Sequence, residues 1–166
     1  MSVTKASRRE FIGEKEFKSD LTVTDPCYDD DVWCVKRLDI TPGIYNCYVW
    51  RHDETIRNLN GKPHTYTTND RIEISLKDKS ETGSKWILCG EIGVDAGLAG
   101  FFNDKPNYND DEWMDFCDRI KDGFAWFEPE GFFSRSGMGD GVYAVLCKKD
   151  ESGKIWAVRI DFYDYI

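Results

Sequence analysis

Three aspartates in turn-forming segments are the residues of this sequence best suited to hold a metal ion. Asp25 lies in Thr-Asp-Pro-Cys-Tyr, Asp95 in Gly-Val-Asp-Ala-Gly and Asp140 in Gly-Met-Gly-Asp-Gly. Each segment adjoins a predicted strand, so the three carboxylates would meet if their loops lie at one end of a sheet. Hard cations such as Ca²⁺ prefer several oxygen ligands, including loop carbonyls. The sequence therefore offers a site for Ca²⁺ or another divalent cation, in a binding module or a metal-dependent enzyme.

The same aspartates also fit a purely structural role. Their spacing does not follow the twelve-residue EF-hand loop, and no glutamate stands at its closing position. Aspartates in turns commonly accept backbone N–H bonds, while the neighbouring glycines supply unusual φ angles. The sequence leaves both interpretations open.

Cysteine chemistry is a further alternative, with Cys27 in a turn as the nucleophile. His52 or His64 would have to act as its base, and a third group would have to orient that base. No Cys-x-x-Cys pair occurs among the six cysteines, which disfavours a zinc site. The first residues lack the apolar centre of a secretory signal, which predicts a cytoplasmic protein. In that compartment we expect six reduced thiols, most of them small core residues.

The formal net charge is −9, and the acidic residues are concentrated in one region. Between Asp104 and Glu130, nine acidic residues stand against three basic ones, a balance of −6. A surface of this sign repels phosphate, so direct binding to nucleic acid or anionic lipid is disfavoured. A basic surface on a partner protein is the complement. The residues expected to contact that partner are Asp110, Asp111, Glu112, Asp115, Asp118 and Asp122.

Those six acids lie on one predicted amphipathic helix, residues 110–122. Its apolar stripe follows the spacing i, i+3, i+4, i+7 and consists of Trp113, Phe116, Cys117 and Ile120. Asn109 is a good N-cap with Glu112 three residues later, and Gly123 suits the C′ position. The helix is therefore expected to pack through one face and to present its acids on the rest.

Aromatic residues around the acidic region could supply an interface with anchors. They are Phe101, Phe102, Tyr108, Trp126, Phe127, Phe132 and Phe133. Large apolar residues are usually buried, so most of these are expected in the core. A few left exposed beside the acidic helix would form apolar anchors within a charged rim, which is the anatomy of a protein interface.

Strand patterns dominate the remainder of the chain. Apolar residues at 156, 158, 160 and 162 alternate with the residues between them, which predicts a half-buried strand. Together with residues 142–147 and a polar turn, it predicts a C-terminal hairpin. Further strands are expected at 20–24, 44–51, 71–77 and 86–94. Residues 52–70 have the composition of an exposed polar excursion.

About five to eight strands and one helix predict a mostly β (α+β) fold. The expected architecture is an antiparallel β-sandwich or curved sheet with the amphipathic helix packed on an open edge or face. The length of 166 residues suits one β-rich domain, residues 20–166, with residues 1–19 as a mobile arm or an edge strand. No apolar run approaches the roughly 20 residues of a membrane helix.

Three blocks of the sequence together resemble a family of small uncharacterised bacterial and phage-borne proteins. The blocks are TDPCY at 24–28, VDAGLAGFF at 94–102 and GDGVYAVLCKKDESGKIWAVRIDF at 139–162. They follow the order of the DPCY turn, VDxGxxGFF segment and C-terminal GDGxY hairpin of that family. The resemblance covers about half the chain and implies a shared fold, with Asp25, Asp95 and Asp140 as framework or site positions. It implies no reaction, and the acidic helix is not part of the pattern.

No segment carries a diagnostic catalytic signature, so no catalytic residue is predicted. The sequence favours a cytoplasmic, non-enzymatic, acidic protein-binding module without a cofactor. A phage-encoded inhibitor of a host nucleic-acid-binding or defence protein would fit, because clustered carboxylates can occupy a groove built for phosphates. The alternative is the divalent-cation module or metal-dependent enzyme built on the loop aspartates. Nothing in the sequence indicates an oligomeric state.

Overall fold

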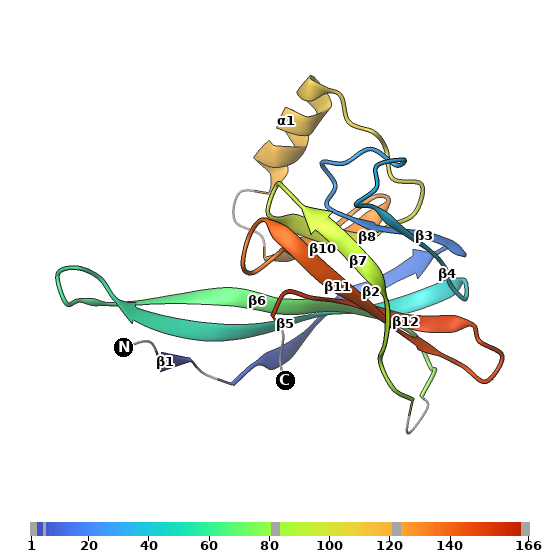
Figure 1. Cartoon of the computed structure of the whole chain (residues 1–166), viewed down its shortest axis with the longest axis horizontal. Coiled ribbons are helices and arrows are strands. Elements are labelled where there is room, and N and C mark those ends of the chain that lie inside the picture. Colours follow the sequence, from blue (N-terminus) through green and yellow to red (C-terminus); the bar gives the residue numbers. More distant parts are fainter. Residues whose placement is uncertain (1–2, 5, 81–83, 121–123, 164–166) are drawn as a thin grey trace.

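Two antiparallel β-sheets and one helix make up the computed structural model (Figure 1). The structure describes residues 3–4, 6–80, 84–120 and 124–163. The larger sheet lies below the smaller one in Figure 1, and the helix lies on the far side of the smaller sheet. This arrangement confirms the predicted mostly β fold with a sandwich-like pair of sheets and one packed helix.

Within the described residues, seven strands form the larger sheet. They are β1 (Val3–Thr4), β2 (Arg8–Phe17), β5 (Gly43–Arg57), β6 (Pro63–Leu76), β7 (Ile87–Val94), β11 (Gly141–Lys149) and β12 (Ile155–Asp161). Their order is β1-β5-β6-β12-β11-β7, and β2 also pairs with β5. The N-terminal segment thus contributes an edge strand. The predicted C-terminal hairpin is confirmed as β11 and β12.

Five strands form the smaller sheet, in the order β4-β3-β8-β10-β9. They are β3 (Asp20–Thr24), β4 (Lys36–Asp39), β8 (Leu98–Phe102), β9 (Ala125–Glu128) and β10 (Gly131–Arg135). The helix, α1 (Asp110–Arg119), connects β8 to β9 along the chain. The described residues therefore hold twelve strands, more than the periodicity predicted, because short strands such as β4 and β9 are too brief to show alternation.

One core fills the space between the sheets, and a second lies between the smaller sheet and α1. The first includes Tyr45 and Ile72 from the larger sheet and Phe101 and Phe132 from the smaller. The second is formed by Leu98, Phe102, Phe116, Ile120 and Phe133. Strand β8 is buried along its whole length because both of its faces are covered. This double burial explains why its sequence, LAGFF, has no polar side.

Glycine at position 100 allows β8 and β10 to approach closely. It pairs with Phe133 across the two strands. A Cβ built on Gly100 would overlap the Cβ of Phe133 and the carbonyl oxygen of Phe132. Two ring pairs, Phe101–Phe132 and Phe102–Phe133, stack across these strands.

The predicted exposed excursion at residues 52–70 is exposed only in its middle, residues 56–66, whereas His52 and residues 68–70 are buried, and most of the segment is strand. Strands β5 and β6 form one long hairpin through this region, with register from Tyr45–Leu76 to Arg57–Pro63. The hairpin extends beyond the sandwich (Figure 1), so side chains near its tip are exposed on both faces. A strand without a buried face needs no apolar alternation, and its polar composition therefore resembles that of a loop.

The expectation of six reduced thiols is wrong for two cysteines. Cys89 of β7 and Cys147 of β11 are joined by a disulfide across 58 residues of sequence. The register of these strands shifts at Cys89, because Leu88 and Gly90 oppose consecutive residues of β11. Of the other thiols, those at 34 and 47 are buried, as expected, and those at 27 and 117 are partly exposed.

Among the described residues, no helix has the length and apolar character needed to cross a bilayer.

Candidate functional site

Helix α1 begins where its sequence predicts and ends sooner. The Asn109 Oδ1 accepts a bond from the Glu112 backbone N–H at 2.9 Å, while its Nδ2 donates to Glu112 Oε1 at 2.8 Å. This reciprocal pair resembles a capping box and confirms the predicted N-cap. Ile120 is the C-cap. Asp122 and the proposed C′ residue Gly123 lie outside the described residues.

The apolar stripe of α1 attaches the helix to the smaller sheet. Phe116 is fully buried and Ile120 is 8 % exposed. The Phe116 ring stacks on Trp113 at 5.2 Å and on Phe133 of β10 at 5.1 Å between centroids. Burial of two large apolar side chains contributes several kcal/mol to docking of the helix, at about 25 cal/mol per Å². The buried face of α1 is therefore firmly packed against the smaller sheet.

That opposite face carries the predicted partner-binding acids. We call it the acidic face; it consists of Asp110, Asp111, Glu112, Asp115 and Asp118, all exposed. Among the described residues, no base forms an ion pair with its four aspartates. Met114 is 59 % exposed and lies on the same side of the helix, three residues after Asp111 and four before Asp118. Three of the four helical neighbours of Met114 are therefore aspartates, and the fourth is Cys117.

A second segment adds acids next to α1. The loop 25–35 places Asp29 and Asp31 in solvent, and its Asp30 backbone N–H donates to Asn107 Oδ1 at 3.1 Å. Asn107 lies just before α1, so this bond holds the loop beside the start of the helix. Trp33, in the same loop, is 86 % exposed. The acid run 29–31 was visible in the sequence, but only the contact with Asn107 places it here.

A buried lysine lies between this loop and the segment that leads to α1. Lys105 is 3 % exposed, and its Nζ donates to the Pro106 carbonyl at 2.7 Å. Burial lowers the pKa of Lys105, against the opposing attraction of Asp30 and Asp29. The buried ammonium group is therefore attracted by the carboxylates of this loop while its hydrogen bond goes to a backbone carbonyl. The sequence did not predict the burial of Lys105, because lysines in loops are normally exposed to solvent.

The predicted aromatic anchors are mostly core residues, as expected. Phe101, Phe102, Phe132 and Phe133 are buried, Tyr108 and Trp126 are partly buried, and Phe127 is 38 % exposed. Phe127 packs against Phe132, whose ring belongs to the core between the sheets rather than to the core beneath α1. The exposed large apolar residues are instead Met114 on α1 and Trp33 on the loop that contacts Asn107.

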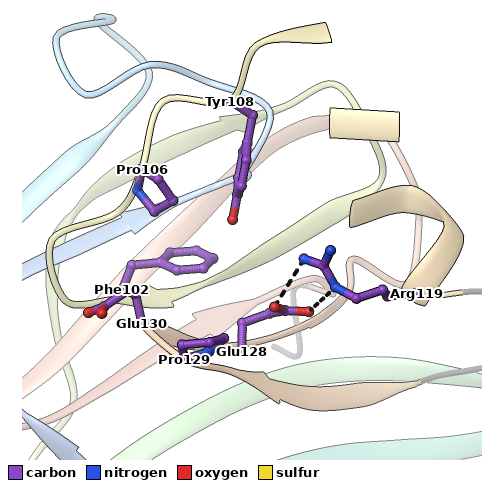
Figure 2. Close-up of a pocket in the computed structure, with 7 residues that line it drawn as sticks. All are labelled: Phe102, Pro106, Tyr108, Arg119, Glu128, Pro129 and Glu130. Carbon is purple, nitrogen blue, oxygen red and sulfur yellow. Dashed lines mark hydrogen bonds and ion pairs between the residues drawn. The ribbon is translucent and has the colours of Figure 1, made fainter. Parts of the chain in front are cut away.

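A cavity of about 220 Å³ opens beneath α1 (Figure 2). It is lined by Phe102, Pro106, Tyr108, Arg119, Glu128, Pro129 and Glu130. The Arg119 Nε and Nη2 lie 3.4 and 3.2 Å from the two carboxylate oxygens of Glu128. Figure 2 shows the Phe102 ring and the Tyr108 hydroxyl directed toward the space beside this ion pair. Burial raises the pKa of Tyr108, with a smaller contribution from Glu128.

Asp25, the first of the three loop aspartates, has a structural role. It is fully buried, and its Oδ1 accepts from the Cys27 backbone N–H at 3.0 Å. Its Oδ2 accepts from the backbone N–H groups of Asp95 and Ala96, at 3.0 and 2.7 Å. One carboxylate thus joins the turn after β3 to the loop after β7.

The three aspartate loops meet only in part. The Ser136 backbone N–H donates to the Gly97 carbonyl at 3.0 Å, which brings the third loop to the second. The side chains of Asp95 and Asp140 are exposed to solvent. In the part of the chain that the structure describes, no three His, Cys, Asp or Glu side chains group in a way that could hold a metal ion. The Asp25 carboxylate therefore joins the first loop to the second, and a backbone bond joins the second to the third.

Cys27 is held as a neutral thiol. Burial raises its pKa well above the ordinary value, and the negative charge of the nearby Asp25 carboxylate raises it further. A cysteine nucleophile needs the opposite shift and a base beside it. His64 instead stacks near Tyr66 on the exposed part of the long hairpin. The geometry around Cys27 therefore does not support nucleophilic chemistry.

His52 belongs to a buried polar cluster that no sequence pattern signalled. Its Nδ1 lies 2.5 Å from Asp70 Oδ1, and its Nε2 lies 3.8 Å from Glu54. Ser7 Oγ donates to the other Asp70 oxygen at 2.5 Å, and the Tyr163 ring meets His52 edge-on. The serine bonds the aspartate rather than the histidine, so the three do not form a nucleophilic relay. The cluster instead fastens both ends of the described chain to the hairpin.

Comparisons of this chain with protein-family models, with curated proteins and with solved structures each found no match. The resemblance to the family of small bacterial and phage-borne proteins therefore stays a prediction.

Proposed function

We propose that this protein is an acidic binding module that docks the acidic face of α1 onto a basic surface of a partner protein. The proposal rests on one observation, that no basic side chain neutralises the aspartates of the acidic face among the described residues. The four aspartates of that face are exposed and have no ion-pair partner among the described residues. A cationic partner would supply the missing counter-charge.

Two like-charge pairs beyond the favourable acidic first turn of α1 are unfavourable for the isolated protein. Asp111 and Asp115 are four residues apart, and Asp115 and Asp118 are three apart. Like charges at these spacings each destabilise a helix by roughly 0.2–0.5 kcal/mol. Sequences tend to break such local rules where function requires it. A basic partner surface would turn this repulsion into attraction and raise the rate of association.

The apolar residues near the acidic face would give the interface its anchors. Met114 is exposed beside Asp110, Asp111 and Asp118, and Trp33 is exposed on the loop that contacts Asn107. Exposed Trp and Met are enriched in the centres of interfaces, where surrounding polar residues exclude water. Their positions therefore suit a docking surface with apolar contacts inside a charged rim.

A groove that normally binds phosphates is the partner surface best matched to clustered carboxylates. Such a groove occurs in nucleic-acid-binding proteins, including host defence proteins. A protein that occupied it would act as an inhibitor, and a phage-encoded one would gain from that activity. This finer assignment rests on the charge of the acidic face.

The test begins with identification of the partner. The immobilised protein would capture host proteins from a bacterial extract, and a candidate would then be purified and titrated by calorimetry at several salt concentrations. The variant carries Asp111→Asn, Asp115→Asn and Asp118→Asn, which removes three charges but keeps the side-chain volumes. At about 0.5–1 kcal/mol for each exposed charge, we expect roughly 10- to 100-fold weaker binding.

A matched control removes three exposed charges elsewhere, by Asp20→Asn, Asp39→Asn and Glu151→Gln. We expect this control to change the affinity less than two-fold. Binding to a basic partner that weakens with salt, and with the helix variant alone, would support the proposal. A complex indifferent to salt and to the helix variant would refute it.

A further inference from the structure

We propose that the tip of the β5–β6 hairpin docks on the acidic face of α1 in a second copy of this chain. We call residues 56–66 the hairpin tip; all of them are exposed. The inference rests on the proposed function, because it assigns a second occupant to the same acidic face. A bound hairpin tip would cover that face, so self-association would compete with the basic partner.

The hairpin tip is a basic segment in an acidic protein. Between Glu54 and Asp70 the sequence has no acidic residue, and it includes Arg57 and Lys62. Both of these bases are exposed, and neither forms an ion pair with another described residue. The Arg57 guanidinium donates to the Gly61 carbonyl at 3.0 Å, a contact that leaves its charge uncompensated. With its histidine neutral, the hairpin tip therefore carries a charge of +2.

The acids at the base of the hairpin have partners of their own. Asp53 Oδ1 lies 3.4 Å from Arg8, and Glu54 accepts a hydrogen bond from the Tyr66 hydroxyl at 2.8 Å. Glu54 stands three residues before Arg57, which is about 10 Å along a strand that rises 3.3 Å per residue. That separation is too long for an ion pair, so the positive charges of the hairpin tip are free to meet another surface.

The turn at the end of the hairpin is held in one shape. The Asn58 Oδ1 accepts from the backbone N–H groups of Asn60 and Lys62, at 3.1 and 2.9 Å. Gly61 has a φ of +74°, which glycine adopts at no steric cost, and its N–H donates to the Asn58 carbonyl at 2.9 Å. Leu59, within this turn, is fully exposed. A pre-formed turn loses little conformational entropy on binding, so it can present Leu59 as an apolar contact.

The acidic face of α1 supplies the opposite charge and a second apolar side chain. The described bases closest to α1 in sequence are engaged elsewhere, because Arg119 pairs with Glu128 and Lys105 is buried. Met114 is exposed among the aspartates and would meet Leu59 of the other copy. Opposite charges around an apolar contact are the complementarity expected of a specific interface.

The contact has to form between two copies. Figure 1 shows the hairpin extending from the sandwich on a different side from α1, so its tip is remote from the helix of its own chain. The net charge of −9 opposes close approach of two copies. Leu59, however, lies seven residues beyond His52, the last buried residue of β5, which corresponds to about 20 Å of strand. This spacing exceeds the Debye length of about 10 Å at 0.1 M salt, so repulsion between the two sandwiches is largely screened.

The first test is sedimentation velocity of the full chain from about 10 µM to about 1 mM, a range suited to a small contact. The tip variant carries Arg57→Gln and Lys62→Gln, and we expect its self-association to be about 5- to 30-fold weaker. The helix variant, with Asp111, Asp115 and Asp118 changed to Asn, should lose association to a similar or greater extent. The matched control, Lys149→Gln with Lys154→Gln, removes two exposed charges from the turn between β11 and β12 and should change association less than about two-fold.

A mixing experiment tests the contact directly. The tip variant keeps the acidic face, and the helix variant keeps the hairpin tip. Each should be largely monomeric alone, and together they should form a complex that contains one molecule of each. Unchanged melting temperatures confirm that the variants are folded. Absence of wild-type association at the highest concentration, an equal effect of the control variant, or a mixture no more associated than its components would overturn the inference.

The two proposals fail in different ways. The tip variant should bind the basic partner at least as tightly as the wild type, because it lacks the competing segment. If the tip variant self-associates like the wild type, the inference falls and the proposed function stands. If the helix variant loses self-association but binds the partner unchanged, the proposed function falls, and the contact between copies stands without its role in competition.

Discussion

Substitution of Asp25 distinguishes a structural aspartate from a metal ligand. The carboxylate accepts three backbone N–H bonds, from Cys27, Asp95 and Ala96. In Asp25→Asn, the amide oxygen can face the two donors of the second loop. The amide NH₂ then faces the Cys27 N–H, which loses its acceptor.

The expected cost follows from these three bonds. A hydrogen bond to a charged acceptor contributes about 1.5–3 kcal/mol, and a buried donor left unpaired costs about 1–3 kcal/mol. Asp25→Asn loses one bond and weakens two, so we expect about 2–4 kcal/mol of destabilisation. For a chain of this length, that corresponds to a fall in melting temperature of roughly 5–15 °C.

The assay is thermal and urea unfolding of the wild type and variants, each in chelator and in excess Ca²⁺. Asp95→Asn and Asp140→Asn are the controls, because both side chains are exposed. They should change the free energy of unfolding by about 0.5 kcal/mol or less. If Ca²⁺ stabilises the wild type and each of the three substitutions removes the same gain, the carboxylates bind metal together, and the structural role assigned to Asp25 is wrong.

Three further predictions test the packing, the helix cap and the buried thiol. Gly100→Ala should destabilise the protein by about 3 kcal/mol in urea unfolding, because its Cβ would overlap Phe133; a change below about 1 kcal/mol would show that β8 and β10 can separate easily. Asn109→Ala should cost about 1 kcal/mol and speed amide exchange in the first turn of α1, since Glu112 loses its cap; unchanged exchange would rule out the cap. Cys27 should resist iodoacetamide at pH 8 and react faster as the pH rises well beyond 9, because its pKa is raised; mass spectrometry measures this, and rapid modification at pH 8 would contradict it. Since folded Cys27 holds its proton more tightly than the unfolded chain does, its contribution to stability should fall as the pH rises above about 8.5.

Local patterns in the sequence were sufficient for the helix and for the strands with one buried face. The stripe that includes Phe116 and the Asn109 cap each depend on residues within one or two turns, so the position of α1 was predictable. The alternation around Val158 likewise predicted β12. The exposure of the acidic face followed from the same stripe, because the side opposite a buried face must meet solvent.

Contacts between distant segments were decided by the tertiary structure alone. The bonds from Asp25 to Asp95 and Ala96 span about seventy residues of sequence, and the bond from Asp30 to Asn107 spans 77. The cavity beneath α1 likewise needs β8, the helix and the β9–β10 turn at once. Periodicity reports only which side of an element is apolar. It carries no information about which other element covers that side, because the packing of the whole chain determines that choice.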